Sequence, residues 1–101
     1  MKVLLVEDDA EFRTDVSEIL MGEGDTVITA ENRSEAEERI RETPFDIVIL
    51  DLAIPTDSST LQPDVAHGRS VISTARTCAP GTPLLVLTGS TAEPFIAELL
   101  A

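Results

Sequence analysis

The sequence predicts an open, doubly wound α/β fold with a parallel sheet, and three observations lead to this fold class. Four short apolar runs recur along the 101-residue chain, and three of them are apolar at every position, as expected of strands buried on both faces. Helical patterns fill the segments between the runs. Repeated strand–helix units imply parallel strands joined by right-handed crossovers. The predicted strands are Val3–Val6, Val27–Thr29, Ile47–Leu50 and Leu84–Leu87.

Apolar periodicity predicts a helix after the first run and another after the third. Positions i, i+4, i+7 and i+8 are apolar over about 10–21, which gives this helix one inward face, and Gly22 and Gly24 follow to end it. A further apolar stripe predicts a helix over about 69–78. The inward residues of the two helices are Phe12, Val16, Ile19 and Leu20, and then Val71, Ile72 and Ala75.

Capping boxes indicate where the other two helices begin. Such a box pairs Ser or Thr with Glu three residues later and satisfies two backbone N–H groups of the first turn. Ser34 with Glu37 predicts a helix after the second run, closed by Pro44. Ser90 with Glu93 predicts a fourth helix after the last run, so every predicted strand is followed by a helix.

One polar segment interrupts the alternation of strands and helices. Residues 56–64 show no periodicity and are predicted as an inserted loop between the third strand and the third helix. Long loops in compact proteins are often functional, so this loop is hypothesised to act as a lid or a partner-selecting element. The alternative is a solvated insertion without a role.

Charge and composition exclude several classes of function. The formal net charge is −12, with 15 acids and 5 bases in residues 1–51, so direct binding to nucleic acid or to anionic lipid is not expected. No apolar run approaches the ~18 residues of a membrane span, and no signal-peptide core is found. The single cysteine, Cys78, excludes an internal disulfide. A cytoplasmic protein is therefore expected.

Acidic side chains follow two of the predicted strands. Glu7, Asp8 and Asp9 come directly after the first strand, and Asp51 comes after the third. The carboxyl ends of parallel strands meet at one edge of a sheet, where Thr88 after the fourth strand would join them. Clustered hard oxygen ligands without histidine or cysteine point to Mg²⁺ or a similar hard ion. A metal beside a carboxylate and a hydroxyl suits phosphoryl transfer to an aspartate nucleophile.

A purely structural reading of these acids is also open. Glu7–Asp9 could simply cap the first helix, where the helix dipole favours negative charge. Asp51 is harder to explain in this way, because Leu52 and Pro55 follow it and no helix starts there.

Three short motifs at these positions resemble those of a bacterial response regulator receiver domain of the CheY-like kind. They are VEDD at 6–9, DLAIP at 51–55 and LTG at 87–89, with Gly68 ahead of an apolar helix. The resemblance covers essentially the whole chain and implies the flavodoxin-like receiver fold. It also implies a histidine kinase or a phosphotransfer protein as partner, with Mg²⁺ as cofactor.

The resemblance implies a role for each matching residue. Asp51 matches the phosphoacceptor, and Thr88 matches the residue that hydrogen-bonds the phosphoryl group. Asp8 would contact Mg²⁺ directly and Glu7 through water, while Asp9 matches a helix start. Two further residues match the family pattern: Ala53, whose backbone carbonyl would ligate the metal, and Gly89, which leaves room for phosphate.

The chain departs from the family pattern at its carboxyl end. The family has a fifth strand, a phosphate-contacting lysine and a fifth helix beyond the threonine, and only 13 residues follow Thr88 here, without a lysine. Residues 1–101 are therefore expected to form a single truncated receiver domain. An unpaired last strand is an association hazard, so self-association through 84–101 is expected.

Two other functions compete with a phosphorylated receiver. The missing lysine favours a pseudo-receiver, which would be a protein-interaction module without phosphotransfer. An aspartate-nucleophile phosphatase of the haloacid-dehalogenase type would need DxDx[TV] after the first strand, and Ala53 stands where its general acid would be. A signalling phosphoacceptor, not an enzyme, is the function that the sequence favours.

Overall fold

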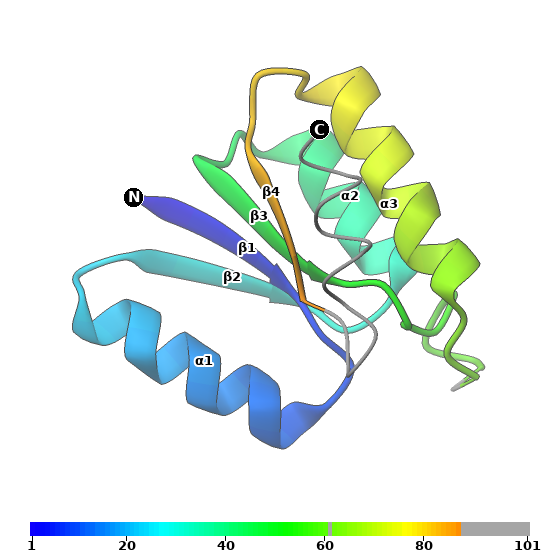
Figure 1. Cartoon of the computed structure of the whole chain (residues 1–101), viewed down its shortest axis with the longest axis horizontal. Coiled ribbons are helices and arrows are strands. Elements are labelled where there is room, and N and C mark those ends of the chain that lie inside the picture. Colours follow the sequence, from blue (N-terminus) through cyan, green and yellow to red (C-terminus); the bar gives the residue numbers. More distant parts are fainter. Residues whose placement is uncertain (61, 88–101) are drawn as a thin grey trace.

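The computed structural model describes residues 1–60 and 62–87, and it confirms the predicted alternation of strands and helices (Figure 1). Each strand and helix that the structure describes lies within a few residues of its predicted place. In chain order the described elements are β1 (Lys2–Val6), α1 (Ala10–Gly22), β2 (Thr26–Ala30), α2 (Arg33–Glu42), β3 (Ile47–Asp51), α3 (Val65–Cys78) and β4 (Leu84–Leu87).

The described strands form one parallel sheet in the order β2-β1-β3-β4. The register pairs Val6 with both Ala30 and Leu50, and Asp51 with Leu87, so the carboxyl ends of all four strands line up at one edge. Because β2 and β3 flank β1 on opposite sides, the chain reverses its direction of winding at β1. A crevice at such a switch point is the usual ligand site of open α/β sheets.

Helices cover both faces of this sheet, with α1 on one face and α2 and α3 on the other (Figure 1). Alternate residues of β1 therefore enter two different cores: Leu4 and Val6 pack toward α2 and α3, and Val3 and Leu5 toward α1. Each is at most 1% exposed. Burying one such side chain contributes roughly 1.5–3 kcal/mol, which explains why β1 is apolar at every position after Lys2.

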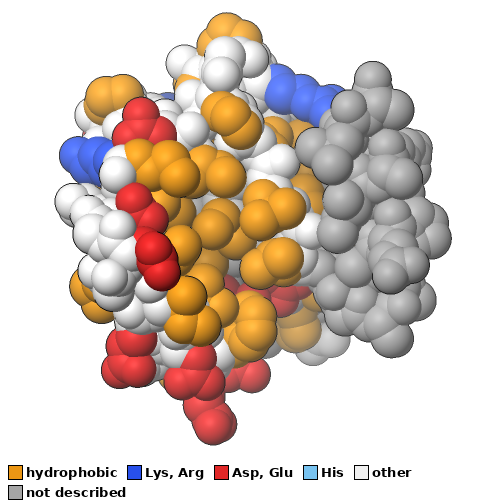
Figure 2. Space-filling view, turned by 60° about the vertical axis from the view of Figure 1, so that its left-hand side comes forward, with side chains coloured by type: hydrophobic (Ala, Val, Ile, Leu, Met, Phe, Trp, Pro, Cys, Tyr) orange, Lys and Arg blue, Asp and Glu red, His pale blue; other side chains and the backbone are white. Residues whose placement is uncertain are grey.

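Helix α1 is packed less deeply than its apolar stripe predicted. Val16 and Leu20 pack against the core beneath the helix, but Phe12 is 43% exposed and Ile19 68% exposed, so their predicted inward orientation was wrong. The helix contacts β1 and β2, which leaves its Phe12 and Ile19 edge without a neighbouring helix among the described residues. Figure 2 shows a face on which hydrophobic side chains gather beside acidic ones.

Helix α2 begins at a different cap from the predicted one. Its N-cap is Asn32, whose side-chain oxygen accepts a hydrogen bond from the Glu35 backbone N–H at 2.9 Å, and the Glu35 carboxylate accepts one from the Asn32 amide at 2.9 Å. The predicted Ser34–Glu37 box was wrong because both side chains are used in tertiary contacts. Ser34 Oγ donates to the Thr56 carbonyl, and Glu37 is buried against Ser70 of α3.

Helix α3 begins at Val65 and not near residue 69. Its N-cap is Asp64, whose carboxylate accepts a hydrogen bond from the Ala66 N–H at 2.8 Å. The sequence predicts that Gly68 lies ahead of the helix, but it lies within α3, where the helix approaches the backbone of Leu52.

The predicted loop between β3 and α3 is tied to its surroundings at both ends. Ile54 and Asp64 form an antiparallel bridge that closes the loop at its base. Arg33 of α2 donates two hydrogen bonds to Thr56 Oγ1, at 3.0 and 2.8 Å, and His67 Nδ1 lies 2.7 Å from the Ile54 carbonyl. The loop is therefore fixed against the amino ends of both α2 and α3.

Some predictions fall on residues that the structure does not describe. Thr88, Gly89 and the fourth helix beginning near Ser90 lie outside the described residues, as does most of the 84–101 segment expected to self-associate. Within the described ranges, no helix is both long enough and apolar enough to cross a membrane.

Candidate functional site

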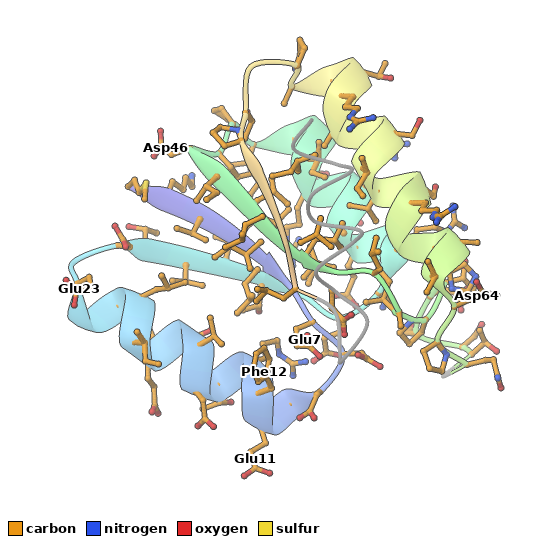
Figure 3. All side chains as sticks on the ribbon, in the orientation of Figure 1. Glu7, Glu11, Phe12, Glu23, Asp46 and Asp64 are labelled. Atoms are coloured by element: carbon orange, nitrogen blue, oxygen red, sulfur yellow. The ribbon has the colours of Figure 1, made fainter. Side chains whose placement is uncertain are left out.

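Three carboxylates meet at the carboxyl edge of the sheet. Glu7 and Asp8 follow β1, and Asp51 is the last residue of the neighbouring strand β3. One carboxylate oxygen from each lies within 4.8 Å of the others. Figure 3 shows Glu7 where the carboxyl ends of the strands converge. Of the four predicted carboxylates, the structure thus brings three together at the switch point between β1 and β3.

The fourth carboxylate, Asp9, belongs to α1. Its Oδ1 accepts a hydrogen bond from the Phe12 N–H at 3.1 Å, and it is the N-cap of the helix. This agrees with the prediction that Asp9 is a helix start and not a metal ligand. Capping therefore accounts for Asp9 alone, because Glu7 and Asp8 lie before the cap.

Backbone groups hold the two inner carboxylates in place. Glu7 is only 6% exposed, and its Oε1 accepts a hydrogen bond from the Asp9 N–H at 3.1 Å. The half-buried Asp51 accepts one at Oδ1 from the Ala53 N–H, also at 3.1 Å. Each carboxylate therefore has one oxygen that no backbone group holds.

The crowded acids shift one another's titration. Burial raises the pKa of Glu7 to about 7, and the charges of Asp51 and Asp8 act in the same direction, against the hydrogen bond from the Asp9 backbone. Burial also raises the pKa of Asp51, while hydrogen bonds from the Ala53 backbone and from Glu7 lower it. Protonated Glu7 thus donates to the Asp51 carboxylate, and a proton compensates part of the negative charge that a cation could neutralise.

The dimensions of the cluster fit a hard divalent ion. Mg²⁺ takes oxygen ligands at about 2.0–2.1 Å in octahedral geometry, so oxygens on opposite sides of the ion lie about 4.2 Å apart. The three carboxylate oxygens lie within 4.8 Å of one another, close to this span. The residues present therefore fit Mg²⁺, with no nitrogen or sulfur ligand in the described cluster.

Sequence reasoning missed one residue at this edge, Arg13 of α1. Its Nη1 donates a hydrogen bond to the Glu7 carbonyl at 2.9 Å, and its Nη2 lies 2.8 Å from the Glu31 carboxylate. The available signal was its spacing: Arg13 precedes Val16 by three and Leu20 by seven residues, which places it on the inward stripe of the helix. A charged residue on such a stripe needs a polar partner there.

Comparison with known proteins identifies the family of this chain. Residues 3–101 match the sequence pattern of the response regulator receiver domain. The chain belongs to the response regulator receiver domain family. Receiver domains are components of two-component signalling systems, and both the predicted resemblance and the predicted fold class are confirmed.

A curated relative supports this membership. A response regulator receiver protein of Anaeromyxobacter sp. strain Fw109-5 is 30% identical over 92 residues, which is 91% of this chain and 35% of that protein. The chain thus spans about a third of the length of the curated relatives that it matches.

Solved receiver domains share the fold. The non-phosphorylated HemR receiver domain from Leptospira biflexa superposes with a TM-score of 0.78 at 27% identity, covering 98% of this chain and 73% of that one. The response regulator TrrA from Thermotoga maritima, solved in complex with Mg²⁺ and BeF, gives a TM-score of 0.77 at 27% identity, covering 99% and 80%.

Proposed function

We propose that this receiver domain accepts a phosphoryl group on Asp51 and does so with Mg²⁺ bound. The observation that carries the proposal is the convergence of Glu7, Asp8 and Asp51 within 4.8 Å at the switch point of the sheet. Three acids so close together, with Glu7 almost fully buried, favour a bound cation. The Mg²⁺ complex of TrrA adds support, because that protein shares the fold.

Each residue has its own task in the proposed site. Asp8 and Asp51 would ligate Mg²⁺ directly, together with the Ala53 carbonyl, and Glu7 would act through water. Thr88 would hydrogen-bond the phosphoryl group, and Gly89 would leave room for it. Bound Mg²⁺ supplies charge neutralisation for the phosphoryl oxygens.

The donor in this proposal is a histidine kinase or a phosphotransfer protein. An Asp51 oxygen forms a bond to phosphorus, the bond between phosphorus and the histidine nitrogen of the donor breaks, and the electron pair of that bond stays on the nitrogen. The domain is thus a cytoplasmic signalling acceptor and not an enzyme in its own right. The inserted loop of residues 56–64, whose Thr56 accepts hydrogen bonds from Arg33, would act in this proposal as a lid or as the element that selects the partner.

Intact-mass spectrometry after incubation with Mg²⁺ and acetyl phosphate tests the proposal. We expect a labile gain of about 80 Da, the mass of one phosphoryl group on the nucleophile. The gain should be absent from Asp51→Asn and retained by Asp57→Asn, which removes a nearby loop carboxylate instead. No gain in the wild type, with Mg²⁺ still bound, would indicate a pseudo-receiver that acts by protein interaction alone.

We propose further that the chain self-associates through the 84–101 edge. In the described sheet β4 pairs only with β3, and Leu85 on this edge strand is 38% exposed. An unpaired apolar strand is a template for another chain. Light scattering should therefore find a species larger than a monomer at high micromolar concentration, and Leu85→Lys should shift it toward the monomer. A monomeric wild type would contradict this.

A further inference from the structure

Arg13 reaches from α1 to the edge of the sheet and makes two separate contacts there. Its side chain is 16% exposed, and its two terminal nitrogens point to different partners, the Glu7 carbonyl at 2.9 Å and the Glu31 carboxylate at 2.8 Å. Glu31 directly follows β2 and its side chain is 57% exposed, so this contact lies at the rim. The planar guanidinium suits such a double contact, because its donors are held in a rigid fork.

The Glu7 carbonyl lies just beyond the end of the sheet ladder. The Glu7 N–H still donates to the Ala30 carbonyl at 3.0 Å, but β1 itself ends at Val6. The carbonyl of Glu7 then accepts its hydrogen bond from Arg13 instead of from a neighbouring strand. Arg13 thus fixes the backbone at the point where it leaves the sheet.

This carbonyl belongs to the peptide group that joins Glu7 to Asp8. Because a peptide group is planar, holding its oxygen also sets the direction of the Asp8 N–H and the position of the Asp8 Cα. On the other side of Asp8, the Asp9 N–H is bonded to Glu7 Oε1 and the Asp9 carboxylate caps α1. The exposed Asp8 side chain is therefore aimed by the backbone on both of its sides.

The charge of Arg13 is paired outside the three-carboxylate cluster. Its ion pair is with Glu31, which is not a member of the cluster, and its bond to Glu7 is to the backbone and not to the carboxylate. Arg13 can therefore shape the cluster without neutralising it.

We propose that Arg13 is a positioning residue for the Mg²⁺ site, holding the Glu7–Asp8 peptide so that both carboxylates converge on Asp51. This inference rests on the proposed metal site. A positioning role and a simple charge effect predict opposite changes in Mg²⁺ affinity when Arg13 is removed. Removing a cation near an acidic site would tighten Mg²⁺ binding by electrostatics alone, whereas loss of positioning weakens it.

Calorimetric titration of Arg13→Gln with Mg²⁺ shows whether the affinity falls or rises. We expect the affinity to fall about tenfold, within the range found when groups that orient metal ligands are removed. Arg41→Gln is the matched control, because it also removes one positive charge and an ion pair with a glutamate, Glu37. Arg41 lies at the carboxyl end of α2, away from the site, and its loss should leave the affinity unchanged or slightly higher.

Two further measurements make the outcome decisive. Arg13→Lys, which keeps the charge but not the fork, should recover part of the affinity lost in Arg13→Gln, and it also serves if the glutamine variant does not fold. In metal-free protein, the NMR order parameter of the Asp8 amide should drop below that of the wild type. Equal or tighter Mg²⁺ binding by Arg13→Gln, or an unchanged Asp8 amide, would overturn the positioning role. A wild type that binds no Mg²⁺ would overturn the metal site instead.

Discussion

A Gly68→Ala variant will be less stable than the wild type by about 3 kcal/mol, the upper end of the usual cost of overpacking. A Cβ at Gly68 would lie 2.3 Å from the Leu52 carbonyl oxygen, 2.4 Å from its Cα and 2.7 Å from its carbonyl carbon. These are backbone atoms that cannot rotate away. The Gly68 N–H also donates to the same Leu52 oxygen at 3.1 Å, so α3 cannot retreat without losing that hydrogen bond.

Urea unfolding measures this effect, and Gly22→Ala provides the control. A Cβ at Gly22, at the end of α1, has no atom within 4 Å and an ordinary backbone conformation, so this variant should be as stable as the wild type or up to about 1 kcal/mol more stable. A loss of about 3 kcal/mol is a large share of the stability of a small domain. A Gly68→Ala variant with wild-type stability would show that α3 does not approach Leu52 so closely.

Mg²⁺ affinity will fall steeply as the pH drops below 7. Glu7 has its pKa raised to about 7, and in its protonated form it donates to Asp51, so the proton and the metal compete for the same oxygens. Below that pKa each bound ion must displace about one proton, which corresponds to about a tenfold loss of affinity for each pH unit. Titrations between pH 5.5 and 8 would measure this slope.

The control for this pH dependence is Glu7→Gln, which keeps the shape of the side chain but cannot ionise. Its Mg²⁺ affinity should be lower than that of the wild type at pH 8, and much less dependent on pH. If the Mg²⁺ affinity of the wild type stayed constant from pH 8 to 5.5, Glu7 and Asp51 would not share a proton that competes with the metal.

The same proton makes the metal-free protein less stable as the pH rises. The pKa of Glu7 is about 7 in the native state against an ordinary value of 4.5, so between these values the native state binds more protons than the unfolded state. The free energy of unfolding therefore decreases across this window as the pH increases, by an amount on the order of 2–3 kcal/mol for this shift. Added Mg²⁺ should reverse the loss above pH 7, because the proposed site is assembled only in the native state.

The sequence predicts the sheet and the position of the site for the same physical reason. Fully apolar runs such as Ile47–Leu50 indicate strands buried on both faces, and parallel strands end at a common edge. The residues directly after the runs, Glu7 and Asp51, therefore had to meet once the fold class was known. The arrangement of the strands alone brings these two residues to the same edge.

Other features depend on contacts between distant segments and could not be predicted from local pattern. Ser34 and Glu37 have the spacing of a capping box, but contacts with Thr56 and Ser70 use both side chains. Gly68 looked like a helix boundary because glycine has low helix propensity, whereas the approach of Leu52 explains it. A local signal is overridden wherever a tertiary contact uses the same atoms.

The place of β1 between β2 and β3 has a consequence for the order of events in folding. Glu7 and Asp51 are 44 positions apart along the chain, and they become neighbours only when β3 pairs with β1. In the unfolded chain, these carboxylates are therefore separate weak ligands. The proposed metal site therefore exists only once β1 and β3 are paired, and the free energy of binding an ion there would add to the stability of the folded state.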